Sequence, residues 1–365
     1  MSEEKNFFDE EQLEKDFEEA FRKTNAELDE LFKQKLVISL LGDVNVGKSS
    51  TINALTGKKL SEVGAYAGLT TEVKPYYYSE NVIIADTPGL ADINQEVSNQ
   101  AEDFVHEDAD IIMFFFNAAV GPTKHMIDTY NKVKKLNKPI ITVLNKIDIW
   151  YEDGILEDKD AYETVISQIK KETGQKVIPI SAKKYINVEE LNNEIISILE
   201  SSGKDLFFLK VSKYKENKVK GWINGAAVSA FGIGVIPVPT ADIIPLTSLQ
   251  VALALKIAYI YNCKVSKNDV MSLIGSTITG SLGKQLFKYG VQLLKGLGWA
   301  GGRLGTGATA TLGGTVAASI TYGFGWTCNA YYKSGMNIDL GHLGEIYTQS
   351  YKEYFKNNQS VPSTV

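Results

Sequence analysis

The sequence predicts an α/β domain with a mostly parallel sheet, flanked by an N-terminal amphipathic helix and a C-terminal all-α domain. Between residues 36 and 203, short apolar runs alternate with stretches of helical periodicity, which is typical of strand–helix units. Residues 204–365 are rich in Gly, Ala, Thr and Ser and show no strand alternation. We therefore expect boundaries at 1–35, 36–203 and 204–365, and a chain of 365 residues is long enough for them.

The first segment predicts an amphipathic helix with a break near Thr24. Its apolar side chains recur every three or four positions between charged ones. They are Phe7, Phe8, Leu13, Phe17, Phe21, Leu28, Leu31 and Phe32. Such a stripe is stable only when buried, so we expect this helix to pack against the C-terminal helices.

Six apolar runs in the second segment predict strands. They are LVISLL, KPYYYS, NVIIADT, DIIMFFFNA, PIITVLNK and KVIPIS. TKHMIDTYNKVKKLN and AYETVISQIKKETG have helical periodicity and predict helices between them. Asp108 and Asp110 precede the fourth run, where we expect them to cap a helix and begin a strand.

GDVNVGKSS, residues 42–50, follows the first predicted strand and precedes a predicted helix. It fits G-x-x-x-x-G-K-[ST], a loop whose backbone N–H groups cradle phosphate oxygens at a helix N-terminus. Lys48 would reach the β and γ phosphates, and Ser49 would ligate magnesium. The expected nucleotide-binding residues in this loop are Asp43, Asn45, Val46, Gly47, Lys48, Ser49 and Ser50.

Residues for magnesium and the γ phosphate follow in the expected order. Thr71 is the favoured switch threonine because a strand is predicted directly after it, and Thr70 is the alternative. Asp86 ends an apolar strand and would hold magnesium through a water, while Gly89 would offer its N–H to the γ phosphate. The expected catalytic set is Lys48, Thr71 and Gly89, and the expected magnesium set is Ser49, Thr71 and Asp86.

Two later motifs select guanine as the base. NKID supplies Asn145, Lys146 and Asp148, and the Asp148 carboxylate can accept two hydrogen bonds from N1–H and the 2-amino group of guanine. Adenine lacks these donors, and a site built for such bonds rejects the analogue by about 10⁴-fold. Lys146 would lie along the base and Asn145 would brace the phosphate loop. ISAKK supplies Ser181, Ala182 and Lys183, where the Ala182 N–H would meet guanine O6.

These five motifs together resemble the GTPase domain of the translation-factor class, closest to the Era, TrmE and EngA group. The resemblance implies a P-loop GTPase domain that hydrolyses GTP to GDP and phosphate with Mg²⁺. Asn45 occupies the position where relatives of TrmE place an asparagine that helps bind potassium. Leu90 stands where Ras-type enzymes keep a glutamine that orients water. The resemblance therefore implies slow hydrolysis unless K⁺, a second GTPase domain in a homodimer, or a partner completes the site.

Residues 222–335 resemble a helical domain of unknown function found behind bacterial GTPase domains, and the layout is distantly similar to interferon-inducible immunity GTPases. The stretches that carry the resemblance are VIPVPTADIIPLTSLQVALALKIAYIYN, SLIGSTITGSLGKQLFKYGVQLLKGLGW and NAYYKSG. Pro237, Pro239 and Pro245 predict a non-helical turn before the helix LTSLQVALALKIAYIY.

The positive charge of the last segment is compatible with two kinds of anionic partner, a membrane or RNA. Residues 204–365 carry 16 basic and 7 acidic side chains, with six lysines between 204 and 220. A polybasic stretch attracts anionic membrane, and the uncharged run 304–332 places small residues four apart, as in membrane helices or tightly packed soluble ones. RNA or the ribosome is the alternative: GSLG at 280–283 mimics a KH loop, although its neighbours have helical rather than strand patterns.

The remaining features favour a cytoplasmic protein, with a peripheral position at the membrane as the alternative. Cys263 and Cys328 lie in apolar stretches and are expected to be reduced, and the acidic N-terminus has no secretory signal. The three histidines show no metal-binding spacing. A GTP sensor or scaffold that does not hydrolyse its nucleotide is the alternative function from another class.

Overall fold

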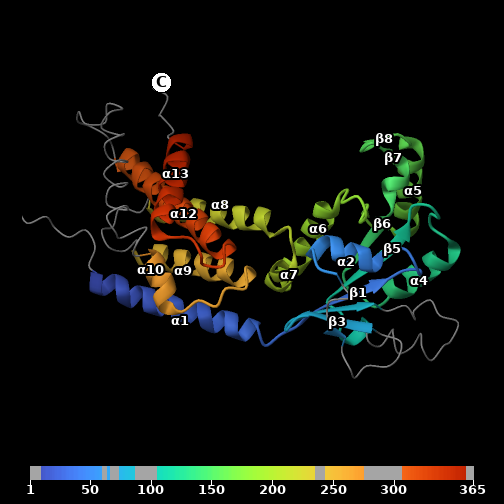
Figure 1. Ribbon diagram of the computed structural model, residues 1–365, viewed down its shortest axis with the longest axis horizontal. Helices are drawn as coiled ribbons and strands as arrows, with labels where there is room; N and C mark the ends of the chain where they lie inside the picture. The colour runs from blue at the N-terminus through green and yellow to red at the C-terminus, as the bar shows by residue number, and fades with distance from the viewer. Residues whose placement is uncertain are drawn as a thin grey trace, which may run out of the picture. The chain divides into compact units, whose positions relative to one another are not determined.

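The computed structural model describes residues 10–59, 64–65, 74–86, 105–234, 243–274 and 306–358 (Figure 1). The chain divides into two compact units. The sheet unit is residues 32–215, and the helical unit combines residues 1–31 with residues 216–365. The sheet unit thus continues past residue 203, because the helix at 205–211 buries Phe207 and Phe208 within it.

The sheet unit contains a seven-stranded sheet in which five neighbouring strands, up to and including one edge, are parallel. β3 and β2 extend one edge in antiparallel pairing. In spatial order the strands are β2 (Gly64–Ala65), β3 (Lys74–Ser79), β4 (Val82–Asp86), β1 (Leu36–Leu41), β5 (Ile111–Asn117), β6 (Ile140–Asn145) and β9 (Val177–Pro179). All six runs predicted as strands form strands, because most of them are long enough and apolar enough to be buried on both faces.

Helices cover the sheet and complete its core. They are α2 (Lys48–Thr56), α4 (Lys124–Lys134), α5 (Lys159–Thr173), α6 (Val188–Glu200) and α7 (Asp205–Val211). A 3₁₀ turn, η3 (Ile147–Trp150), leads into the small hairpin of β7 (Tyr151–Glu152) and β8 (Ile155–Leu156). α4 and α5 share one apolar core with β5 and β6. Within that core Phe114 meets Tyr130 edge-on at 5.1 Å.

Asp110 directly precedes β5, as predicted, but its carboxylate joins two other segments where a helix cap was expected. Its Oδ2 accepts from the Val37 N–H at 2.9 Å, and its Oδ1 pairs with the Lys204 ammonium at 2.6 Å. The same ammonium donates to the Lys35 carbonyl at 2.8 Å. Asp110 therefore fixes the start of β1 and β5 to the connection between α6 and α7.

The helical unit contains α1 (Glu10–Leu31), α8 (Lys215–Gly234), α9 (Ile243–Ile260), α10 (Lys267–Ile274), α12 (Thr306–Lys333) and α13 (Leu340–Asn357). α1 packs against α9, as the apolar stripe predicts, and buries Phe17 and Leu28 (Figure 1). α1 is continuous, so the predicted break at Thr24 is wrong: one Thr costs little in a helix that tertiary packing supports. Phe7 and Phe8 lie outside the described residues.

Pro245 lies inside α9 and not in the turn expected before it. It occupies the first turn, where its missing N–H has no intrahelical partner to lose. Pro237 and Pro239 lie outside the described residues.

Small residues of the uncharged run allow helices to approach closely within the helical unit. A Cβ on Gly325 of α12 would lie 2.8 Å from Cγ1 of Ile223 in α8, and one on Gly323 would lie 3.0 Å from the Tyr347 carbonyl of α13. Ala318 between neighbouring helices is fully buried. These contacts favour the packing interpretation of the small-residue pattern. In the described part of the chain, no helix combines the length and apolarity that crossing a membrane requires.

Candidate functional site

The predicted motifs come together at one end of the sheet, where the parallel strands have their carboxyl ends. β1 ends in the phosphate loop, β4 ends at Asp86 and β6 ends at Asn145. The chain after β9 supplies Ser181. Ligands of open α/β sheets bind at this end, so the fold provides a single site for motifs that lie far apart in sequence.

The phosphate loop has left-handed backbone at three positions, which turns its N–H groups toward one space. The φ angles are +137° at Gly42, +63° at Asn45 and +96° at Gly47. A side chain cannot be added at either glycine, because a Cβ on Gly42 would lie 2.6 Å from the Phe115 carbonyl oxygen. A Cβ on Gly47 would lie 2.3 Å from Nδ2 of Asn145. Both glycines are therefore required by close contacts as well as by φ.

Lys48 begins α2, and its side chain is only 8% exposed. Its ammonium donates to the carbonyls of Gly42 at 2.9 Å and Asp43 at 3.2 Å. It also lies 3.6 Å from Oδ1 of Asp86. The structure thus places a cation beside both the phosphate loop and the carboxylate at the end of β4. Ser49 and Ser50 follow in the first turn of α2 and are exposed.

Asn145 joins three of the motifs through one buried side chain. Its Nδ2 donates to the Val46 carbonyl at 2.9 Å, within the phosphate loop. Its Oδ1 accepts from the N–H groups of Lys146 at 2.8 Å and Ala182 at 3.2 Å. The side chain is 2% exposed, so water does not compete for these bonds. The phosphate loop, the NKID turn and the SAKK loop are therefore held in one arrangement.

Asp148 lies in η3, which begins after Lys146 in a left-handed conformation with φ of +69°. One carboxylate oxygen, Oδ1, accepts from the Ser181 hydroxyl at 2.7 Å. The Ser181 hydroxyl also accepts from the N–H of Lys184 at 3.1 Å. This fixes the carboxylate while leaving Oδ2 to face other donors. Ala182 is buried and Lys183 is exposed.

Several expected site residues cannot be placed. Thr70, Thr71, Gly89 and Leu90 lie outside the described residues, as does the GSLG segment. In the described part of the chain, no group of three or more His, Cys, Asp or Glu side chains could hold a metal. The expected magnesium set contains only one such residue, Asp86, and draws its other ligands from hydroxyl groups.

Sequence patterns missed a second set of contacts, which lie behind the base-binding loop. This loop is residues 181–186 and contains the SAKK motif. Tyr185 follows the SAKK motif and is 58% exposed. The Lys213 ammonium lies 4.0 Å from the centre of its ring. Nothing in the spacing indicates this pair, although an aromatic residue directly after a binding loop was a signal worth testing.

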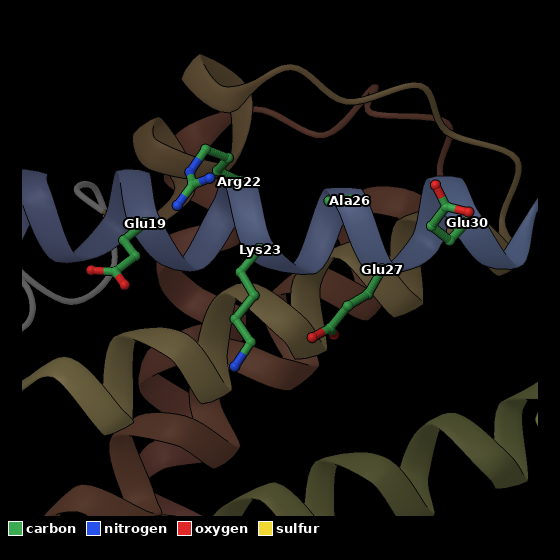
Figure 2. A pocket seen from close by; sticks show the side chains of 6 residues that line it. All are labelled: Glu19, Arg22, Lys23, Ala26, Glu27 and Glu30. Carbon is green, nitrogen blue, oxygen red and sulfur yellow. The ribbon is translucent and has the colours of Figure 1, made fainter.

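A hollow of about 590 Å³ lies along the exposed face of α1, in the helical unit (Figure 2). It is lined by Glu19, Arg22, Lys23, Ala26, Glu27 and Glu30. Figure 2 shows Lys23 and Glu27 extending to the same side of the helix. All six lining residues are exposed and none carries a buried polar group, so the hollow has no feature of a ligand site.

The strand–loop–helix around Lys48 and the guanine-type motifs define a P-loop GTPase domain. Comparison with known families agrees: residues 37–146 match the family described as 50S ribosome-binding GTPase. Residues 210–360 match a "Domain of unknown function (DUF697)". The predicted resemblance of both parts is confirmed, and the chain carries a P-loop GTPase domain together with a helical domain of unassigned role.

The similar proteins are GTPases that share this domain. GTPase Era of Aquifex aeolicus is 33% identical over 187 residues, covering 47% of this chain and 58% of Era. The probable tRNA modification GTPase MnmE of Cyanidium caldarium is 31% identical over 181 residues, covering 48% of this chain and 36% of MnmE. This chain therefore spans less than two thirds of either relative.

Two solved Era structures each match a little under half of the chain. An Aquifex aeolicus Era variant bound to GDP·AlF₄⁻ is 29% identical, covering 45% of this chain and 57% of that chain with a TM-score of 0.35. An Era complex with MgGDPNP and a fragment of 16S ribosomal RNA is 28% identical, with a TM-score of 0.34 and coverage of 45% and 57%.

Proposed function

We propose that this protein binds and hydrolyses GTP and passes its nucleotide state to the helical unit. One observation carries the proposal: the buried Asn145 side chain ties the phosphate loop to both base-recognition motifs. A nucleotide that fills the site contacts both ends of this network at once. Phosphate and base recognition are therefore presented by one preorganised frame, and this limits the ordering cost of binding.

Guanine is the base that the chemistry of Asp148 favours. Ser181 holds one oxygen of the carboxylate, so the other can face the N1–H and 2-amino donors of the base. Adenine would cover this half-buried carboxylate without supplying those donors, which is unfavourable. We propose that Lys146 lies along the base and that the Ala182 N–H, which donates to Asn145 Oδ1 in the structure, also meets guanine O6.

The phosphate end fits a magnesium nucleotide. We propose that Lys48 moves from its loop carbonyls to the β and γ phosphates, while Ser49 and Asp86 hold Mg²⁺ through hydroxyl and carboxylate oxygens, the ligands this ion prefers. When bound, the ion would offset charge that develops on the phosphate oxygens. Asn45, in left-handed conformation in the same loop, is the proposed potassium ligand.

Hydrolysis and switching are assigned to the segments that follow β2 and β4 in the sequence. We propose that Thr71, or alternatively Thr70, and Gly89 contact the γ phosphate and release their loops after hydrolysis. Leu90 supplies no group that can orient water, so turnover should be slow without K⁺, a second copy of the GTPase domain or a partner. If neither K⁺, a second GTPase domain nor a partner completes the site, the protein would act as a GTP sensor that does not hydrolyse its nucleotide.

Two partners of the helical unit remain as proposals. Charge supports an anionic membrane, but within 204–220 at least Lys204, Lys213 and Lys215 already have partners in the sheet unit. These contacts narrow the surface that lipid could use. The RNA alternative has the same charge in its favour and the similarity to Era, one structure of which contains 16S ribosomal RNA.

GTP turnover by the full chain tests the proposal. Phosphate release is measured with K⁺ or Na⁺, across protein concentration, with and without anionic vesicles or RNA. The proposal predicts turnover that rises with K⁺ and with protein concentration and that is lost in Lys48→Met. A protein that fails to bind GDP or GTP overturns the function itself. Tight GTP binding with no turnover under any condition leaves only the sensor alternative.

A further inference from the structure

We propose that Tyr185 and Lys213 are positioning residues that hold the base-binding loop and couple the bound nucleotide to α8. This inference rests on the proposed function, because it concerns the regulation of the same site. It is carried by the contacts of four residues, Ser212 to Lys215, which follow α7 and end with the first residue of α8. All the contacts described below lie within the sheet unit.

The base-binding loop has few internal contacts of its own. It is closed by a pair of backbone hydrogen bonds between Ser181 and Ile186, of 3.0 and 3.1 Å. Tyr185 lies at its outer end with a φ of +58° and an exposed side chain. The Lys213 ammonium lies 4.0 Å from the Tyr185 ring and 4.9 Å from the Tyr214 ring, so two aromatic faces surround one cation. This contact holds the loop from outside the nucleotide site.

Lys213 also reaches the helix that begins at the phosphate loop. Its backbone N–H donates to the Leu55 carbonyl at 3.0 Å, in the last turn of α2. The side chain of Lys213 lies 3.8 Å from where a Cβ on Gly57 would be, directly after the same helix. One residue therefore contacts both the element that carries Lys48 and the loop that carries Ala182.

The connection is rigid on both sides of Lys213. The buried Ser212 hydroxyl donates to Oδ1 of Asn192 in α6 at 2.5 Å and accepts from the Tyr214 N–H at 3.0 Å. The Ser212 N–H donates to the Phe208 carbonyl at 2.9 Å. Two residues later, the Lys215 ammonium donates to the Lys210 carbonyl at 3.1 Å, and α8 begins. A shift of Tyr185 would thus act through the Lys213 side chain on a connection that these hydrogen bonds hold in place up to the start of α8.

Coupling of this kind is reciprocal. If nucleotide binding stabilises the Lys213–Tyr185 contact by some factor, then this contact strengthens nucleotide binding by the same factor. Removing the contact must therefore weaken nucleotide binding. An exposed cation–π pair contributes ~0.5–1 kcal/mol, so its loss can change the equilibrium constant for nucleotide binding by at most about two- to fivefold. The predicted effect is therefore small, specific to the pair and within the range of kinetic measurement.

The test measures release of a fluorescent GDP analogue from the full chain by stopped flow. Lys213→Met and Tyr185→Leu should each speed release about two- to fivefold, and the double variant should be no faster than either single one. Lys213→Arg and Tyr185→Phe keep the cation and the ring and should release at the wild-type rate. Lys220→Met, which removes the same charge further along α8, is the matched control. Hydrogen exchange of residues 212–215 should slow when GDP binds the wild type and slow less in Lys213→Met.

Each outcome decides the inference. Wild-type release rates in Lys213→Met and Tyr185→Leu would refute the claim that this pair holds the base-binding loop. Additive effects in the double variant would also refute it, because the two residues would then act separately. Acceleration by Lys220→Met to the same degree shows a general charge effect and also overturns it. If the rate of hydrogen exchange at residues 212–215 is the same with and without GDP, the proposed coupling to α8 is refuted. A wild-type protein that binds no guanine nucleotide is a failure of the proposed function, which is distinct from all of these.

Discussion

Replacing Asn145 by Ala should disorganise the nucleotide site without touching any nucleotide-facing charge. The substitution removes the partner of the Val46 carbonyl and of the N–H groups of Lys146 and Ala182. Because Asn145 is 2% exposed, water cannot easily replace the lost bonds. The phosphate loop and the base-binding loop would then lose their common support.

The magnitude follows from the three bonds. Each buried group left without a partner costs about 1–3 kcal/mol, so Asn145→Ala should destabilise the sheet unit by about 3 kcal/mol or more. For a unit of this size, 1 kcal/mol shifts the unfolding midpoint by roughly 2–4 °C. We therefore expect the sheet unit to unfold about 6–12 °C lower, and GDP to bind at least ~10-fold more weakly.

Calorimetry of the full chain and titration with a fluorescent GDP analogue measure the two effects. Asn131→Ala is the matched control, because Asn131 is exposed on α4 and its loss should change stability by less than about 0.5 kcal/mol. An Asn145→Ala protein that unfolds within about 2 °C of wild type and binds GDP normally would refute the role of Asn145 as the common support.

Three further predictions concern single contacts. Gly325→Leu should lower the unfolding midpoint of the helical unit in calorimetry, because a Cβ there already lies 2.8 Å from Ile223; an unchanged midpoint would contradict the close packing. Burial and the nearby Lys58 lower the pKa of Lys215 from 10.5 to about 8. Between those pH values the unfolded chain binds more protons, so wild-type stability rises with pH there. Lys215→Met should thus be the more stable protein at pH 7 in urea unfolding and lose that advantage from pH 8 upward; a difference independent of pH would contradict this. Lys204→Met should cost about 2 kcal/mol in the same assay by leaving the Asp110 carboxylate without its cation.

The sequence predicts the sheet well because its strands are buried apolar runs that end in recognisable loops. Leu36–Leu41 and Ile111–Asn117 are almost entirely buried, so apolar content alone distinguishes them. Phosphate loop and base motifs are local patterns whose backbone requirements, such as the left-handed Gly47, are specific to a few residue types. These parts of the site could be located before any tertiary contact was known.

Contacts between segments far apart in the chain could not be predicted in this way. Thr24 and Pro245 disfavour helix locally, yet both lie in helices that neighbouring helices support. The charge run 204–220 suggested a free basic surface, but Lys204 and Lys213 have partners 94 and 28 positions away in sequence, Asp110 and Tyr185. The spacing of residues in the sequence does not predict these partners, because the contacts depend on how α6 and α7 pack against the sheet.

The measurement that tests the central claim most directly is the base preference of wild type and Asp148→Asn. Affinities for GDP and XDP are measured by competition against one fluorescent nucleotide. Asn keeps the oxygen that accepts from Ser181 but offers an N–H₂ donor where xanthine presents a carbonyl. The account predicts that wild type prefers GDP and that Asp148→Asn prefers XDP. Equal preference in the two proteins, or a wild type that does not distinguish GDP from XDP, would contradict the assignment of this end of the sheet as a guanine-nucleotide site.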